Sequence, residues 1–105
     1  MKDVLKIADG VLKECMDKDV ETVVIPEGVT EIGGCAFKGC ESLASVEIPS
    51  SVTVISAGAF KDCTSLTSVA FSGTVAQWKS VEKGIRWNDG VPATSVKCSD
   101  GEAEL

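Results

Sequence analysis

Cysteine is the residue type in this chain best suited to carry chemistry. Five are present: Cys15, Cys35, Cys40, Cys63 and Cys98. A thiol nucleophile needs a base to activate it and a third group to orient that base, and the 105 residues include no histidine, the commonest such base. Cys35, which follows Gly33-Gly34, would depend on a lysine or a helix N-terminus to lower its pKa. We therefore expect no enzymatic activity and no catalytic residue.

The same cysteines fit a metal site or a disulfide framework poorly. A zinc site built from thiolates needs four that converge, usually as two close pairs, whereas Cys35 and Cys40 are the only close pair and no Cys-x-x-Cys is present. An odd number of cysteines argues against a full set of disulfides. We expect free, buried thiols packed as small apolar side chains, and no metal and no cofactor.

The acidic balance of the chain restricts its partners. Sixteen Asp and Glu face 10 Lys and Arg, a net charge of -6, which argues against a nucleic-acid binder. The acidic turns at 88–90 and 99–102 lack the series of oxygen ligands that a calcium loop needs, so they are predicted to be plain turns. No apolar run is long enough to cross a membrane, and residues 1–6 carry charge where a signal peptide needs an apolar stretch. We expect no membrane insertion and no signal peptide, and the location stays open.

The elements that position these residues are set by an internal repeat. Residues 25–47 align with residues 48–70 at a period of 23, with 13 identical positions. Partial copies lie on both sides of this pair. Such a period is typical of a stacked array in which equivalent residues form ladders through one continuous core. We expect Val46 and Ile48 to point inward from one short strand of each coil, and a second short strand at 29–32 and 52–55. Residues 36–40 and 59–63 are predicted to form one short helical turn each, with a phenylalanine that fills the interior and with Cys40 and Cys63 as ladder neighbours.

The two ends of the array are predicted to be caps. At the N-terminus, Asp9-Gly10 between alternating apolar runs indicates a hairpin, with a helix over residues 2–8 as the alternative. At the C-terminus, Thr74 and Gln77 form the pattern of a capping box, so we expect a helix to about Lys83 with Gly84 as its C-cap glycine. Strands are expected at 93–98 and 102–105. The chain is thus expected to be a single domain over 1–105, with a cap at 1–18, repeat coils at 19–73 and a second cap at 74–105.

The repeated pattern Leu-x-x-Val-x-Ile-Pro-x-x-Val-x-x-Ile-x-x-x-Ala-Phe-x-x-Cys resembles the BspA-like leucine-rich repeat family of bacterial surface proteins. The resemblance covers residues 20–73 closely. It implies a β-rich, right-handed leucine-rich repeat solenoid used for adhesion or protein recognition, without enzymatic activity. It also implies a cell-surface or secreted location.

The outward positions of the first strands are the candidate binding face. They form two rows, Thr22, Ser45 and Ser68 in one and Val24, Glu47 and Ala70 in the other. A partner protein would lie here, bound weakly or through several copies because the face is small. The alternative is ordinary solvated sheet surface, since these side chains are small. Trp78 and Trp87 could form a stacking platform, but we favour a role in covering the open end of the core.

The function that these observations favour is a small, non-catalytic protein-interaction module with an unidentified protein partner. The alternative is a structural unit with no ligand of its own. In either case the chain is expected to be a monomer or to associate weakly with itself.

Overall fold

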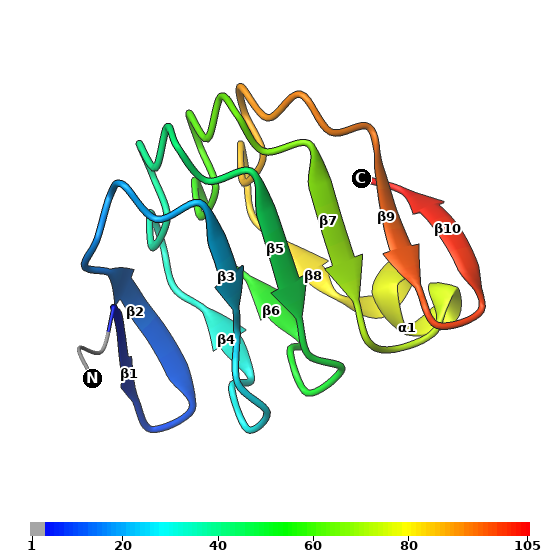
Figure 1. The fold of residues 1–105 in the computed structure, drawn as a ribbon. Coiled ribbons are helices and arrows are strands. Elements are labelled where there is room, and N and C mark those ends of the chain that lie inside the picture. The colour runs from blue at the N-terminus through cyan, green and yellow to red at the C-terminus, as the bar shows by residue number, and fades with distance from the viewer. Residues whose placement is uncertain (1–3) are drawn as a thin grey trace.

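Each repeat supplies one strand to each of two sheets, and the two sheets face each other across the core (Figure 1). This arrangement is seen in a computed structural model that describes residues 4–105. The first sheet has the spatial order β1 (Leu5–Ala8), β2 (Val11–Cys15), β4 (Glu31–Ile32), β6 (Val54–Ile55) and β8 (Glu82–Lys83). The second has the order β10 (Gly101–Glu104), β9 (Ser95–Cys98), β7 (Ser68–Phe71), β5 (Ser45–Ile48) and β3 (Thr22–Val24). The expected β-solenoid is therefore confirmed.

Strand register follows the sequence repeat. Within each sheet, the strands of successive coils run parallel, and Val23 pairs with Val46, which pairs with Val69. In the other sheet Ile32 pairs with Ile55. Equivalent residues of successive coils thus lie beside one another, as the ladder interpretation requires. The second strands are shorter than expected, two residues in each coil.

The core is a stack of identical side chains. Phe37 and Phe60 are fully buried or nearly so and stack with ring centroids 4.8 Å apart and planes 3° from parallel. That separation matches the spacing between hydrogen-bonded strands. Rings at equivalent positions of successive coils therefore lie at stacking distance. The other apolar identities of the repeat are equally hidden, among them Leu43, Leu66, Val46 and Val69.

The segment that carries each phenylalanine is a series of tight turns, and the expected helical turn is wrong. In the first coil the N–H groups of Ala36, Lys38 and Cys40 each donate to a carbonyl three residues back. The N–H groups between them, those of Cys35, Phe37 and Gly39, donate to the next coil. Because alternate N–H groups pair between coils, the chain cannot direct all of them along a helix axis.

The N-terminal cap is a hairpin, as expected. Strands β1 and β2 pair antiparallel around Asp9 and Gly10, which have φ of 53° and 78°. Positive φ at both central residues is the geometry of the tight turn that Asp-Gly favours. The strand over residues 5–8 replaces the alternative helix over 2–8, of which residues 2 and 3 lie outside the described part of the chain.

The C-terminal helix begins where the sequence predicts and ends earlier. Helix α1 spans Val75–Ser80, and the capping box of Thr74 and Gln77 is present. Its C-cap is Val81, in extended conformation, so the expected helix to Lys83 and the C-cap role of Gly84 are wrong. Residues 82–83 form β8 and continue the first sheet, because β8 pairs parallel with β6.

The solenoid therefore continues through the segment that contains the helix. Gly84 N–H donates to the carbonyl of Ile55 at 2.7 Å, and Trp87 carbonyl accepts from Phe60 N–H, also at 2.7 Å. Helix α1 is an insertion into a third coil, between β7 and β8. The antiparallel strands β9 and β10 then end the second sheet around the Ser99–Asp100 turn.

Candidate binding face

The two predicted rows of outward residues lie side by side on the second sheet. Thr22 pairs with Ser45 and Ser45 with Ser68. In the adjacent row, Val24 pairs with Glu47 and Glu47 with Ala70. All six are exposed or half-buried, while the residues between them, such as Val23 and Val46, are buried.

The face extends beyond the six predicted residues. Lys97 of β9 pairs with Ala70, and Glu102 of β10 pairs with Lys97, so the second row continues across five strands. Ser95 and Glu104, paired with each other, continue the first row. The repeat could not reveal these residues, because neither β9 nor β10 repeats the sequence of a coil.

The face is small for a protein interface. Five strands span four spacings of about 4.8 Å, roughly 19 Å, and three to four residues of strand add about 10–13 Å in height. The sheet surface is then a few hundred Å², well under the ~800 Å² per partner of a standard stable interface.

A groove lies at one end of these strands, where the chain leaves each of them through an Ile-Pro or Phe-Ser dipeptide. We call it the strand-end groove. It has a volume of ≈ 300 Å³. Its lining residues are Val24, Ile25, Pro26, Glu27, Glu47, Ile48, Pro49, Ala70, Phe71 and Ser72. The row of Val24, Glu47 and Ala70 in the candidate face thus forms one wall of the groove.

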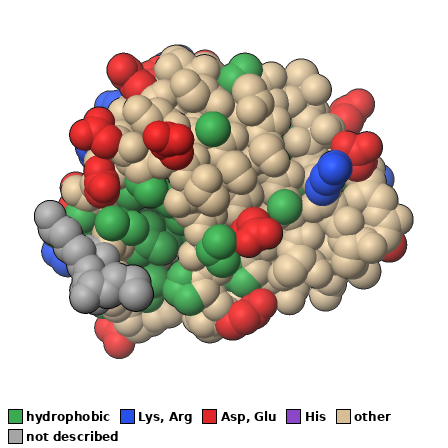
Figure 2. Space-filling model, viewed as in Figure 1, with side chains coloured by type: hydrophobic (Ala, Val, Ile, Leu, Met, Phe, Trp, Pro, Cys, Tyr) green, Lys and Arg blue, Asp and Glu red, His purple; other side chains and the backbone are tan. Residues whose placement is uncertain are grey.

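The surface chemistry changes along the face. Figure 2, viewed from the side of the second sheet, shows hydrophobic side chains gathered towards β2 and β3, with acidic side chains beside them. Acidic and basic side chains lie together near β9 and β10. Val24, 61% exposed, is one of the large apolar side chains that the fold leaves uncovered.

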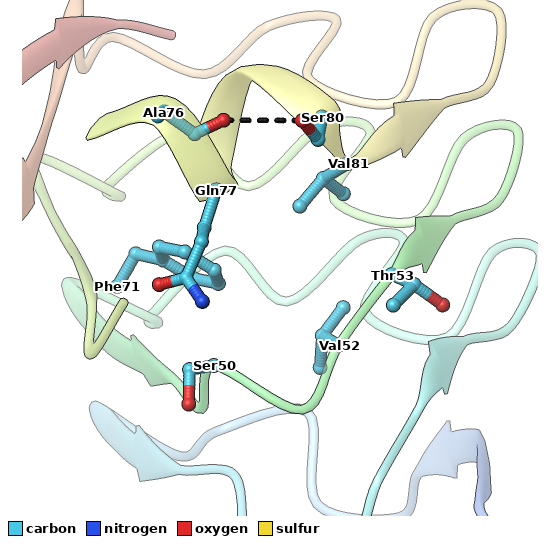
Figure 3. Close-up of a pocket in the computed structure, with 8 residues that line it drawn as sticks. All are labelled: Ser50, Val52, Thr53, Phe71, Ala76, Gln77, Ser80 and Val81. Atoms are coloured by element: carbon cyan, nitrogen blue, oxygen red, sulfur yellow. Dashed lines mark hydrogen bonds between the residues drawn. The ribbon is translucent and has the colours of Figure 1, made fainter. Parts of the chain in front are cut away.

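A second hollow lies between α1 and the turn that joins β5 to β6 (Figure 3). Its volume is ≈ 300 Å³, and its lining residues are Ser50, Val52, Thr53, Phe71, Ala76, Gln77, Ser80 and Val81. The polar side chains make local bonds: Gln77 Oε1 accepts from Thr74 N–H, and Ser80 Oγ donates to the Ala76 carbonyl. None of these lining residues has an acidic, basic or thiol side chain, so none of them could serve as the base that activates the hydroxyls of Ser50, Thr53 and Ser80.

Three of the five cysteines form a buried cluster, whereas Cys35 is exposed and Cys98 is half-buried, so the expected burial is wrong for these two. Cys15, Cys40 and Cys63 are fully buried, and Cys63 Sγ donates to the Phe37 carbonyl at 3.0 Å. Burial raises the pKa of Cys40 to about 12 and that of Cys63 to about 11. The thiols of Cys40 and Cys63 therefore stay protonated at neutral pH. A protonated thiol packs well among apolar side chains and is a poor nucleophile. Cys15 joins the cluster from the hairpin, where no repeat could predict it.

The two tryptophans cover the C-terminal end of the core, as we favoured. Trp78 and Trp87 are 1% and 8% exposed, and their rings meet edge to face at 6.0 Å. Lys83 lies over the Trp78 ring at 4.5 Å, and its Nζ donates to the carbonyls of Trp78 and Val81. Desolvation lowers the pKa of Lys83. Neither indole presents a face on which a sugar could stack.

Among residues 4–105, no group of three or more His, Cys, Asp and Glu side chains comes together in a way that could hold a metal ion. No helix in the same part of the chain is long and apolar enough to cross a bilayer.

Comparison with known proteins identifies the repeat. The family model described as "BspA type Leucine rich repeat region (6 copies)" matches residues 3–81. A solved structure, described as a leucine rich cell surface protein from Faecalibacterium prausnitzii A2-165, is 44% identical with a TM-score of 0.59. The match covers 60% of this chain and 17% of that protein, so this chain corresponds to a small part of its neighbour. No curated protein sequence matches the chain.

Proposed function

We propose that this chain, which belongs to the family of BspA-type leucine-rich repeat proteins, is a non-catalytic protein-recognition module of cell-surface type. Its partner would lie on the outer face of the second sheet, across the rows of Thr22, Ser45 and Ser68 and of Val24, Glu47 and Ala70. The observation that carries the proposal is the alignment of these six outward residues in unbroken rows over three parallel strands. A flat, repetitive face of this kind is what solenoids offer to proteins.

The size of the face determines how such a module would work. A few hundred Å² supports weak binding to a single copy. Several copies displayed together convert later contacts into intramolecular ones, which raises avidity without any new contact. The neighbouring cell surface protein, of which this chain matches 17%, shows that the same coil type occurs within a much longer chain.

A capture experiment tests the proposal. The wild-type domain and a Ser45→Arg, Ser68→Arg variant are immobilised at high density and exposed to extracellular-matrix and cell-surface proteins. Both substitutions place long side chains in the first row and point outward from the sheet, so the core is untouched. A protein retained by the wild type and lost by the variant supports the recognition role.

The matched control is a Ser42→Arg, Ser65→Arg variant. These two serines are also equivalent positions of successive coils and are exposed, but they lie in the turns away from the face. If this control still retains the captured protein and the face variant does not, the loss is caused by the change in the face and not by the added charge. Equal retention of a protein by all three would refute the proposed face and locate the binding elsewhere, with the Trp-bearing cap as the next candidate. If none of the three retains a protein above background, the alternative function, a structural unit with no ligand of its own, takes its place.

A further inference from the structure

We propose that the strand-end groove takes an extended peptide segment that carries an apolar side chain next to a lysine or arginine. This inference rests on the proposed function, because it names the class of partner that the same face would hold. It concerns one edge of that face, since the groove lies at the ends of the strands and Val24, Glu47 and Ala70 of the face form one of its walls.

The groove exists because successive coils bend at equivalent positions, after Ile25, Ile48 and Phe71. Val24, Glu47 and Ala70 form one wall, and the chain turns away from the sheet immediately afterwards. Equivalent bends stack at one strand spacing, so the groove runs across three coils and is roughly 10 Å long. An extended chain rises about 3.3 Å per residue, so a length of three peptide residues fits.

The walls of the groove suit an apolar side chain. Pro26 and Pro49 line it, and proline has no N–H with which to pair a peptide backbone. The nearby backbone donor of Ser50 is already used, since it donates to Ser72 Oγ at 2.8 Å. Contact with the exposed side chains of Val24 and Pro26 would therefore hold the occupant by burial of apolar surface, whereas Pro49 is itself buried.

The charges in the groove select a cationic occupant. Glu27 and Glu47 both line it and are both exposed, and no lysine or arginine is among the lining residues. The chain as a whole carries a net charge of -6, so an acidic segment would meet repulsion. The same argument disfavours a second copy of this chain, which would bring its own acidic surface to the groove.

The test uses peptide binding to the isotope-labelled protein, followed by nuclear magnetic resonance. Three capped hexapeptides share a central Val-Leu pair and differ only in its neighbours: two lysines, two glutamines or two glutamates. We expect the lysine peptide to shift the amide signals of Val24, Glu47 and Ala70. Because two exposed ion pairs are each worth a modest amount, it should bind about two- to thirtyfold more tightly than the glutamine peptide. The glutamate peptide should bind most weakly.

Two variants decide whether the groove is responsible. Glu27→Gln with Glu47→Gln should remove the preference for the lysine peptide while keeping the apolar contact. Glu41→Gln with Glu82→Gln removes the same charge from exposed positions outside the groove and should keep the preference. High salt should weaken the lysine peptide towards the affinity of the glutamine peptide, because it screens exposed charges.

Three results would overturn the inference: no shift at millimolar peptide, equal affinity for the three peptides, or groove signals that move with protein concentration alone. The last would identify a second copy of the chain as the occupant. The outcome is separate from that of the proposed function. Loss of a captured protein in the Ser45→Arg, Ser68→Arg variant, without peptide binding in the groove, would uphold the recognition face and refute the cationic peptide.

Discussion

Replacing Gly84 by alanine should destabilise the protein more than any other glycine-to-alanine change in the turns. A Cβ atom there would collide with the backbone N of Ala57 and would lie 2.8 Å from the Cα of Ala57 and 2.8 Å from the carbonyl carbon of Ser56. All three atoms are backbone of the adjacent coil, and Gly84 itself is bonded to that coil through Ile55. None of them can rotate away, so the two coils would have to separate.

The expected loss follows from the cost of overpacking. Inserting a methyl group into a well-packed site costs typically 1–3 kcal/mol, and three contacts with rigid backbone place Gly84→Ala at about 3 kcal/mol. That is roughly a hundredfold in the unfolding equilibrium. It is also a large part of the ~5–15 kcal/mol by which a domain is usually stable.

Urea unfolding followed by tryptophan fluorescence measures this loss, because Trp78 and Trp87 both lie in the coil that contains Gly84. The midpoint should fall while the slope stays the same, since the surface exposed on unfolding does not change. Gly34→Ala is the control. A Cβ at Gly34 meets only the Ala57 carbonyl at 3.6 Å, an ordinary contact, so this variant should lose nothing or gain about 0.4–1 kcal/mol.

A third variant separates this reasoning from a C-cap role. A C-cap glycine with positive φ tolerates asparagine better than alanine, whereas Gly84 has no positive φ and asparagine there meets the same backbone atoms. Gly84→Asn should therefore be at least as unstable as Gly84→Ala. If the free energy of unfolding of Gly84→Ala lies within about 0.5 kcal/mol of that of Gly34→Ala, the two coils do not approach each other as closely as described.

Three other predictions concern the core and its cap. Phe60→Ala removes the middle of the ring stack and should cost about 3–5 kcal/mol in the free energy of unfolding, measured by urea denaturation; a loss under 1 kcal/mol would contradict the stack. The urea midpoint should fall as pH rises from 9.0 towards 11. Unfolded thiols ionise near 9.0, whereas burial keeps the pKa of Cys63 at about 11 and that of Cys40 at about 12, so the folded state loses stability over this range. A constant midpoint would show that these thiols are solvated. Burial lowers the pKa of Lys83, so this group raises stability over the same pH range. It is one group against two thiols, so the midpoint should still fall. Thr74→Ala should cost about 1 kcal/mol through loss of the helix cap, whereas Thr74→Ser keeps the hydroxyl oxygen and most of the stability; equal losses in a thermal melt would show that the cap contributes nothing.

The sequence predicts the coils well because the same residue types recur at the same phase. Val46 and Val69 had to point inward together, and the outward neighbours of each followed from the alternation of a strand. The outward position of the six candidate residues therefore follows from the repeat. Their role in binding stays a proposal.

Prediction fails where the period changes. Helix α1 lengthens the third coil, where Glu82 pairs with Val54. Lys83 pairs with Ile55, so it takes the position that the buried Ile32 and Ile55 take in the first two coils. A charged residue at an inward position hides the strand from any argument based on apolar alternation. The expected helix is too long because a glycine such as Gly84 is a typical C-cap signal, whereas the helix already ends at its C-cap residue Val81.

The tight turns were missed for a different reason. A run such as Ala-Phe-Lys-Gly-Cys has no proline and fits one turn of helix as well as successive tight turns. What decides between them is pairing with the next coil, for example Phe37 N–H to the Ala59 carbonyl at 2.7 Å. That partner is a long-range contact, which local propensity does not describe.

The reversal of strand direction at both ends of the molecule bears on how such a protein can change its length. Hairpins β1–β2 and β9–β10 each place an antiparallel strand outside the parallel coils. In the sheet that a hairpin closes, a coil added beyond that hairpin would meet a hydrogen-bonding pattern different from the one that coils offer one another. A duplicated 23-residue unit placed between β3 and β7 meets the same parallel partners on both sides and adds one more rung to every internal ladder. Lengthening is therefore accommodated in the middle of the chain, with the terminal hairpins carried along unchanged.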